Sequence, residues 1–397
     1  MEKILGKSRL LILASTFPAA PGDGTPEFVA DLASEQAKHF DTAVLVPAVP
    51  GGARNEQRNG FRVRRFRFFP RRWEDLADGA IIENIRTRKS RLLQVVPFLI
   101  AETVATFRAV RRGKPDIIHA HWIIPQGIVA RLVAPTTPTV ITTLGGDLYA
   151  LNSWPFRALK RWVLRRAAYV TVMNEEMAKL VVELGADPDR VEVLPMGADL
   201  STVRPHVQAT DDTLRLLFVG RLVEKKGVSV LLKALQSLDG VNWELNIVGD
   251  GPLRESLEAN APKGVTFLGT QGREALREAY ANSDIALFPS VPTANGDQDG
   301  LPVALLEAMG SGCAIVASDL PGISEAVQHE RTGLLTAPGS ADAVAKAIQR
   351  LAADPSLRKE LGKNAADIAR TTYSKDAIGR KYVEILNRIR KRRGPSA

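Results

Sequence analysis

Apolar segments typical of buried β-strands alternate with helical segments along almost the whole chain, and this alternation constrains the fold more than any other feature. Helical patterns, such as residues 27–39 and 154–166, separate most of the strand segments. Because continuous apolar strands joined by helices pair in parallel and are covered on both faces, the sequence predicts an α/β protein with parallel sheets. The strand segments begin near Leu10, Ala43, Asp116, Thr139, Tyr169, Val191, Leu214, Trp243, Val265, Asp284 and Ala314.

The length of the chain predicts two domains. Its 397 residues exceed the usual size of one domain, and 45% hydrophobic with 24% charged residues is typical of a globular protein. Residues 195–212 are polar, contain turn residues and show no apolar period, so we place the domain boundary there. Residues 376–390 have the pattern of a further helix, followed by a basic tail.

The segment of residues 299–316 combines two carboxylates with a helix start. Asp299 lies on a loop, a helix follows at once with Glu307 inside it, and a buried strand comes next. Carboxylates accept hydrogen bonds from sugar hydroxyls, and a helix N-terminus favours an anion such as phosphate. The alternative is a surface loop before an amphipathic helix whose apolar residues are core.

A second segment, residues 214–227, places two cations after a strand. The apolar strand ends at Gly220, Arg221 follows, and Lys226 lies just before the glycine that leads into the next helix. Two cations at the end of a parallel strand can bind a diphosphate, although a solvated basic turn would look the same. A third glycine turn, with Gly249 and Gly251, lacks the full dinucleotide-binding spacing and is a weak signal by itself.

In this order and spacing, the three motifs resemble the retaining glycosyltransferases of family 4, and the resemblance extends over residues 10–390. It implies the α/β GT-B fold, in which two Rossmann-like domains have parallel sheets that face each other across a cleft. On this basis we expect an acceptor-binding domain at residues 1–198 and a nucleotide-sugar-binding domain at residues 199–375. The helix in residues 376–397 would cross back to the first domain.

The resemblance also implies roles for single residues of the second domain. Arg221 and Lys226 would bind the donor diphosphate, beside the glycine turns at Gly220 and Gly249, and Glu307 would bind the ribose hydroxyls. The family usually has Glu where this chain has Asp299, and the side chain of Asp is one methylene shorter. The donor sugar would lie against Asp299, Gly300, Leu301, Pro302 and Val303.

Two histidines, His119 and His121, end an apolar strand of the first domain. Alternation sends both side chains to one face, a spacing that could serve a metal, but the sequence offers no nearby third ligand. We therefore expect no metal, in agreement with the metal independence of the resembling family. That family has the second histidine, here His121, in the cleft near the donor sugar and phosphate, while His119 is expected to be buried and hydrogen-bonded.

Two further segments of the first domain correspond to family motifs. Residues 142–147 occupy the place of a Thr-His-Gly-x-Asp motif, with Leu144 in place of the histidine, and Asp147 is the expected acceptor-binding residue. The loop of residues 21–27 resembles the glycine loop of the family, in which Gly24 would approach the donor phosphate. An ordinary turn between a strand and a helix is the alternative for this loop.

The function implied is a retaining transferase that moves a hexosyl unit from a nucleotide sugar to an acceptor hydroxyl in polysaccharide biosynthesis. The donor would be UDP- or GDP-linked, the acceptor a glycan, a lipid-linked or cell-envelope glycan or a small molecule, and no cofactor is implied. For a mechanism of front-face attack, the expected catalytic residues are His121, Arg221 and Lys226. The alternatives are a nucleotide-sugar epimerase of the same fold, and a basic membrane-binding or nucleic-acid-binding protein without catalysis.

The positive charge of the chain is concentrated in its first half. The net charge is +9, and residues 61–73 contain six arginines interleaved with five aromatic residues. With no recognisable nucleic-acid module, this pattern favours an anionic membrane surface as partner over nucleic acid. An edge strand with a solvated basic face is the alternative, and residues 92–107 suit a helix in a membrane interface as well as one packed on a core.

Cysteine usage and the N-terminus indicate the compartment. Cys313 is the single cysteine, which excludes an intramolecular disulfide, and its apolar surroundings suit a core position. The first residues carry charges, the apolar run after them is short, and no run resembles a membrane span. We expect a cytoplasmic protein, peripheral on the inner face of the plasma membrane.

Overall fold

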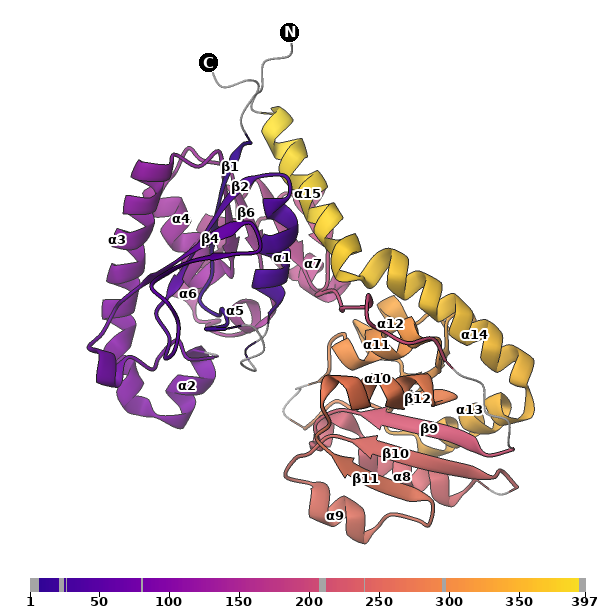
Figure 1. Ribbon diagram of the computed structural model, residues 1–397. Helices are drawn as coiled ribbons and strands as arrows, with labels where there is room; N and C mark the ends of the chain where they lie inside the picture. The colour runs from indigo at the N-terminus through magenta and orange to yellow at the C-terminus, as the bar shows by residue number, and fades with distance from the viewer. Residues whose placement is uncertain are drawn as a thin grey trace. The chain divides into compact units, whose positions relative to one another are not determined.

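The computed structural model describes residues 7–20, 25, 27–79, 81–206, 212–238, 240–294 and 298–392. The chain forms two compact units, each with its own sheet and helices (Figure 1). Unit 1 comprises Met1–Leu194 with Ile378–Ala397, and unit 2 comprises Pro195–Ala377. The prediction of an α/β fold with two parallel sheets is confirmed. The chain passes from unit 1 to unit 2 after Leu194 and returns after Ala377.

Unit 1 is built on an eight-stranded sheet in the order β3-β4-β2-β1-β5-β6-β7-β8. Neighbouring strands are parallel except for β3 and β4, which form an antiparallel hairpin at one edge. The hairpin turns at Asn59 and Gly60, both of which have positive φ, as a tight two-residue turn requires. The strands are β1 (Arg9–Leu13), β2 (Asp41–Pro47), β3 (Asn55–Arg58), β4 (Phe61–Phe66), β5 (Ile117–His121), β6 (Thr139–Thr142), β7 (Tyr169–Val172) and β8 (Val191–Val193).

Helices cover both faces of this sheet because side chains alternate along each strand. Leu10 and Ile12 of β1 pack with α1 (Phe28–Ala37) and the C-terminal helix α15 (Lys375–Arg392). Leu11 and Leu13 of β1 point to the opposite face and pack with α3 (Val95–Gly113). The other helices of the unit are α2 (Ile81–Thr87), α4 (Ile128–Val133), α5 (Gly146–Tyr149), α6 (Trp154–Leu164) and α7 (Glu175–Glu183).

The C-terminal helix belongs to the core of unit 1. Ile378, Tyr382 and Leu386 of α15 are almost fully buried among side chains of α1 and β1. The hydroxyl of Tyr382 lies 3.3 Å from Thr142 Oγ1 and 3.0 Å from Thr171 Oγ1, at the ends of β6 and β7. Helix α15 thus packs in the core of unit 1, although it follows unit 2 in the sequence.

Unit 2 has a six-stranded sheet in the order β11-β10-β9-β12-β13-β14, and its neighbouring strands are parallel. One apolar core contains α8 and α13, and the other contains α11 and α14. The strands are β9 (Leu214–Val219), β10 (Trp243–Val248), β11 (Val265–Gly269), β12 (Ile285–Phe288), β13 (Ala314–Ser318) and β14 (Leu334–Thr336). The helices are α8 (Val228–Gln236), α9 (Arg254–Ala259), α10 (Arg273–Ala281), α11 (Val303–Ser311), α12 (Ile323–Ala326), α13 (Ala341–Ala353) and α14 (Pro355–Ile368).

Candidate functional site

The strand order of unit 2 identifies one place for a ligand. From β9 the chain continues to β10 and β11 on one side, and from β12 it continues to β13 and β14 on the other. In open parallel sheets, ligands bind beyond the carboxyl ends of the strands where the order reverses in this way. Gly220 lies in the loop after β9, and Asp299 lies in the loop after β12.

An ion pair joins the two motifs at this switch point. Lys226 Nζ lies 2.8 Å from Asp299 Oδ2, and Ser290 Oγ donates a hydrogen bond of 2.7 Å to the same oxygen. Asp299 is 7% exposed, and within the described residues its Oδ1 accepts no hydrogen bond. Arg221 is exposed and makes no ion pair with the described part of the chain. The structure therefore brings two cations and one carboxylate to the loops where a diphosphate sugar was expected.

Two glycines hold the loops after β9, β10 and β12 against one another. Gly227 has φ +66°, and a Cβ there would lie 1.8 Å from the carbonyl oxygen of Pro289. Gly249 has φ +135°, and a Cβ there would lie 2.0 Å from the carbonyl oxygen of Gly220. Any other residue would force these loops apart, so the glycines fix the position of the lysine at the switch point.

Helix α11 begins directly after the carboxylate loop. Gly300 and Leu301 lead into Pro302, the N-cap residue, which provides no side-chain hydrogen bond to the first turn that starts with Val303. The N–H groups of Val303 and Ala304, which have no partner among the described residues, and the helix dipole favour an anion close to Asp299. The first turn of α11 therefore adds backbone donors to the two cations.

Glu307 lies one turn further along α11 and is held by a tyrosine. Tyr280, buried at the end of α10, donates a hydrogen bond of 3.1 Å from its hydroxyl to Glu307 Oε2. Burial raises the pKa of Glu307, and the Tyr280 hydrogen bond and the charge of Arg273 partly oppose that rise. Glu307 is half-buried, so its carboxylate is positioned but still able to accept hydrogen bonds from a ligand.

Unit 1 has its own switch point, between β1 and β5. His119 and His121 lie on β5 beside it, and both are fully buried. His119 is hydrogen-bonded, as expected, but by side chains: Gln36 Nε2 lies 3.2 Å from Nδ1 and Thr142 Oγ1 lies 2.8 Å from Nε2. The ring of Tyr382 stacks on it with a centroid distance of 5.4 Å. This network joins β5 to α1, β6 and α15.

His121 differs from the expectation for a residue that projects into an open cleft. Neither ring nitrogen has a hydrogen-bond partner among the described residues, and the side chain is 0% exposed. The ring of Phe28, at the start of α1, packs edge-on against it at 5.9 Å. Burial lowers the pKa of His121 to about 3, so the imidazole is neutral at physiological pH. Within the described part of the chain, these two nitrogens and Gln36 Oε1 are buried polar atoms near this switch point that have no hydrogen-bond partner.

Asp147, the expected acceptor-binding residue, is engaged within unit 1. Thr143 donates to Oδ1 at 2.6 Å, the backbone N–H of Ile123 donates to Oδ2 at 2.5 Å, and the residue is 6% exposed. Burial raises the pKa of Asp147, while these hydrogen bonds and Lys160 oppose the rise. The carboxylate thus joins the end of β6 to the turn after β5, which is a structural role that the motif did not indicate.

Gly24, the expected phosphate-binding glycine, lies outside the described residues. Among the described side chains, no group of three or more His, Cys, Asp and Glu residues gathers as a metal site would require. Sequence reasoning missed Ser290 and Tyr280, which hold the two carboxylates of unit 2. Ser290 could have been found, because it lies in the loop just after the apolar strand β12, whereas Tyr280 carries no such signal.

Both halves of the chain are similar to known protein families. Residues 23–197 match the family described as "Glycosyl transferase 4-like domain", and residues 202–368 match "Glycosyl transferases group 1". An amylovoran biosynthesis glycosyltransferase of Erwinia amylovora is 31% identical over 53% of this chain and 53% of its own length. The chain therefore spans about half the length of that curated relative.

Solved structures resemble the whole chain in fold. Sucrose-phosphate synthase from Thermosynechococcus elongatus matches with a TM-score of 0.72 at 21% identity, over 97% of this chain and all of the other. HepE from Anabaena, solved in complex with UDP, matches with a TM-score of 0.70 at 18% identity, over 96% of this chain and all of the other. At these identities the likeness concerns the fold.

Proposed function

This chain belongs to the family 4-like glycosyltransferases, which have the GT-B fold, and from that premise we propose that it is a retaining hexosyltransferase of polysaccharide biosynthesis. Its donor is a UDP- or GDP-linked sugar, and its acceptor is a hydroxyl of a glycan, a lipid-linked glycan or a small molecule. The amylovoran relative supports the pathway, and the UDP complex of the structural neighbour supports the donor class. A cytoplasmic location agrees with a single, buried cysteine.

The observation that carries the proposal is the pair of Lys226 and Asp299 at the switch point of unit 2, with Arg221 exposed on the same loop as Lys226. Lysine has three donors, so its ammonium group can bind Asp299 and a phosphate oxygen together. Oδ1 of Asp299, which accepts no hydrogen bond from the described residues, can accept one from a sugar hydroxyl. The pair of Lys226 and Asp299 would thus bind the diphosphate and the sugar of one donor molecule.

The proposed chemistry needs charge stabilisation at the leaving group. The bond between the anomeric carbon and the β-phosphate oxygen breaks, and the acceptor oxygen bonds to the same face of that carbon. The acceptor proton passes to the departing phosphate. Arg221, Lys226 and the first turn of α11 stabilise the negative charge that develops on the diphosphate. His121 is a neutral hydrogen-bonding group in this scheme.

Substitution of the two carboxylates tests the assignment of donor groups. Glu307→Gln should weaken the affinity for free nucleoside diphosphate about tenfold, because its partners are ribose hydroxyls. Asp299→Asn should leave that affinity within about threefold of the parent and reduce turnover at least tenfold, because its partner is the sugar. Calorimetry with UDP and GDP and transfer assays measure the two quantities. Equal loss of nucleotide affinity in both variants would contradict the proposal.

The stereochemical claim has a separate test. Proton NMR of the first product formed from an α-linked donor should show an α-linked glycoside, and a β-linked product would show inversion. Incubation with the donor alone should leave its sugar unchanged, whereas conversion to an epimer without acceptor would favour the epimerase alternative.

A further inference from the structure

Helix α3 and the 3-10 turn before it, Lys89–Gln94, expose a long apolar face on the outside of unit 1. Leu93 is 75% exposed, Val96 62% and Ile100 60%, and Leu92, Val104 and Phe107 are each more than one third exposed on the same side. The opposite side, with Phe98, Glu102 and Thr106, is buried against the sheet. Contiguous exposed apolar surface of this kind marks an interaction site on a soluble protein.

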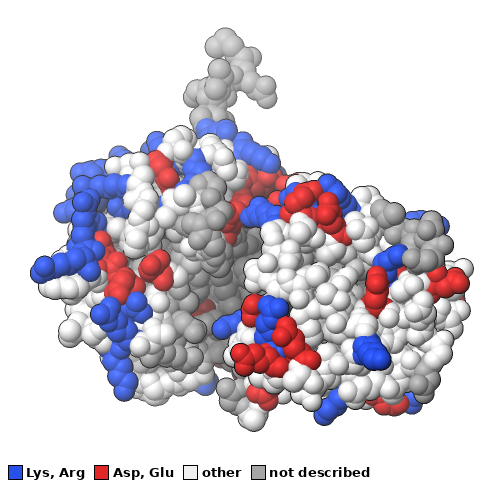
Figure 2. All heavy atoms as spheres, turned by 60° about the horizontal axis from the view of Figure 1, so that its bottom comes forward, with Lys and Arg blue, Asp and Glu red and all other residues white. Residues whose placement is uncertain are grey.

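This apolar face is bordered by cations at both ends. Arg88 and Lys89 precede it, Arg108, Arg111 and Arg112 follow it, and all five side chains are exposed. Glu102 is the single acidic residue of the sequence between Thr87 and Lys114, and it is buried. Figure 2 shows Lys and Arg side chains gathered along the edge of unit 1 where Figure 1 places α3.

A second helix of the same layer repeats this pattern. Helix α4 packs between α3 and α6, so the outer sides of these helices form one face of the unit. On α6, Trp154 is 82% exposed and Trp162 39%, with exposed Arg157 and Arg161 beside them. Arg131 of α4 lies over the ring of Trp162, at 5.4 Å from its centroid. Tryptophan and arginine together are typical of a membrane interface.

We propose that this layer, the outer sides of α3 and α6, is a docking surface for a membrane that contains anionic lipids. The apolar side chains would enter the boundary between headgroups and acyl chains, and the arginines would bind lipid phosphates. The proposal concerns a surface and does not depend on the transferase activity.

The helix lies on the membrane and does not cross it. The sequence predicted no membrane span, yet Lys89–Gly113 is long and apolar enough for one. However, α3 connects β4 to β5 within a single sheet, and Phe98 on its inner side packs against that sheet. A helix held along one whole side by its own domain has only its other side available to lipid.

The charge of the face favours lipid over a second copy of the chain. A twofold contact places the same patch on both partners, which would bring the arginines of α3 against those of the other copy. An anionic lipid surface supplies the complementary charge. Docking to an anionic lipid surface and docking to a second copy of the chain therefore predict opposite effects of salt and opposite results for self-association.

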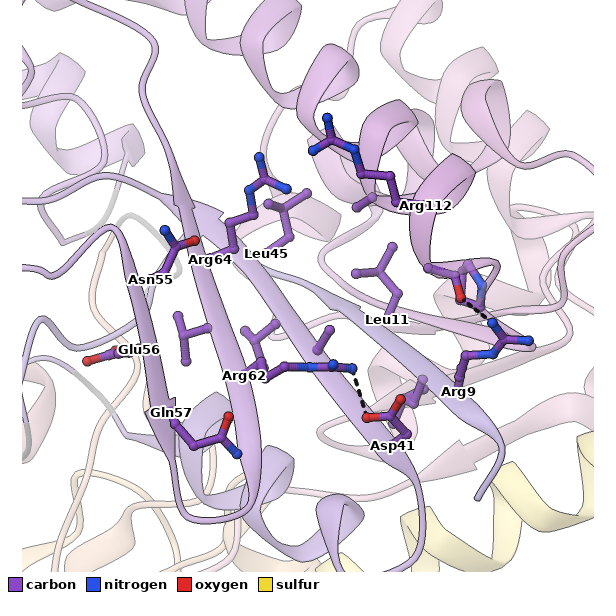
Figure 3. A pocket seen from close by; sticks show the side chains of 17 residues that line it. Arg9, Leu11, Asp41, Leu45, Asn55, Glu56, Gln57, Arg62, Arg64 and Arg112 are labelled. Atoms are coloured by element: carbon purple, nitrogen blue, oxygen red, sulfur yellow. Dashed lines mark hydrogen bonds and ion pairs between the residues drawn. The ribbon is translucent and has the colours of Figure 1, made fainter. Parts of the chain in front are cut away.

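A cavity beside α3 adds cations to this part of unit 1. It has a volume of about 760 Å³ and lies at the amino ends of β1 and β2, away from the carboxyl ends where His121 lies. Arg64 of β4 and Arg112 of α3 line it (Figure 3), and neither has an ion pair within the described ranges. Arg62, on the same strand, is paired with Asp41 at 2.8 Å. The two unpaired guanidinium groups suit a lipid phosphate at the border of the docking surface.

Vesicle flotation tests the proposal with the full chain. We expect binding to vesicles of phosphatidylcholine with about 30% phosphatidylglycerol to be at least tenfold tighter than to phosphatidylcholine alone, and to weaken as salt rises from about 0.1 to about 0.5 M. The combined substitution L93S, V96S and I100S should reduce binding at least tenfold. L268S, which changes an apolar residue of similar type exposed on β11 of unit 2, is the matched control and should bind as the parent does.

Two further measurements keep the result interpretable. Arg64→Gln with Arg112→Gln should weaken binding to the anionic vesicles severalfold, while Lys346→Gln on unit 2 should not. If the triple variant fails to fold, as its melting curve would show, L93S alone should give a smaller loss. Equal vesicle binding by the parent and the α3 variants would overturn the proposal. So would absent vesicle binding together with a dimer, seen by ultracentrifugation, that the same α3 substitutions dissociate.

Discussion

Arg221 and Lys226 have different surroundings, so their removal should have different consequences. Arg221 is exposed without an ion pair in the described structure, whereas Lys226 neutralises the buried carboxylate of Asp299. Arg221→Ala should reduce nucleoside diphosphate affinity by about 1.5–3 kcal/mol, the value of a charge-assisted hydrogen bond, and leave stability unchanged. Lys226→Ala should reduce affinity similarly and also lower the free energy of unfolding by about 1–3 kcal/mol, because Asp299 stays buried without its cation. Calorimetry and urea denaturation measure the two effects, and unchanged affinity in both variants would remove these residues from the site.

The buried imidazole of His121 should make stability depend on pH. Its pKa in the folded chain is about 3, whereas an unfolded histidine has a pKa near 6.5. Because the unfolded chain takes up a proton that the folded one does not, the stability contribution is complete above about pH 6.5. It is lost progressively as the pH falls toward about 3, by about 1.4 kcal/mol per pH unit.

The His121→Gln substitution separates the contribution of His121 to this pH dependence of stability from that of the other titratable groups. Between pH 7 and pH 5 the parent should lose about 2 kcal/mol through His121, and His121→Gln should lose correspondingly less over the same range. His119 has a pKa lowered well below its usual value and contributes in the same direction, so the slope should decrease without vanishing. Urea denaturation at pH 7, 6 and 5 measures the slope, and identical slopes would show that His121 is exposed in solution.

At the scale of elements, the loop after β9 depends on a glycine that the sequence motif singled out. Gly227 and Gly240 both have positive φ, but a Cβ at Gly227 would meet the Pro289 carbonyl while the surroundings of Gly240 are open. Gly240→Ala should therefore cost about 1 kcal/mol of stability through its backbone alone. Gly227→Ala should cost clearly more and weaken nucleotide binding, because it separates the loops after β9 and β12. Comparable losses in the two variants would show that the close contact is unimportant.

The sequence predicted the strands that are long and apolar and missed those with other signals. Each of the eleven expected strand starts corresponds to an observed strand. Strand β4 corresponds to the alternative interpretation of residues 61–73, a strand with alternating arginines, but β3, which pairs with it and forms the edge of the sheet, was not predicted. The Asn59-Gly60 pair was an available signal for the turn. Strand β14 has three residues, which is too short for any periodic pattern.

The candidate site was predictable in its residues but not in its contacts. Local sequence patterns show directly that a glycine, a cation and a carboxylate lie in these loops. The pairing of Lys226 with Asp299 depends on β12 lying next to β9, a choice of strand order that local sequence does not specify. The burial of His121 under Phe28 likewise results from the packing of α1 on the sheet.

At the scale of the whole molecule, the two units divide the proposed functions between them. Unit 2 contains both carboxylates, both cations and two apolar cores of its own, and it is formed by one continuous stretch, Pro195–Ala377. Unit 1 is formed by two separate stretches and contains His121 and the α3 docking surface. A domain with its own core can fold alone, whereas unit 1 needs the C-terminal helix that follows unit 2.

This division predicts the behaviour of unit 2 produced as a separate protein. Residues 195–377 should unfold cooperatively and bind nucleoside diphosphate within about threefold of the affinity of the full chain, since the proposed diphosphate and ribose contacts, except that of Gly24, lie inside them. They should show no sugar transfer, because the acceptor groups and His121 belong to unit 1, and no binding to anionic vesicles. The Arg221→Ala variant of the fragment is the control for specific binding, since it should lose affinity as it does in the full chain. A folded fragment that does not bind nucleotide would show that unit 1 contributes to the donor site, and the assignment of the donor to unit 2 alone would then be wrong.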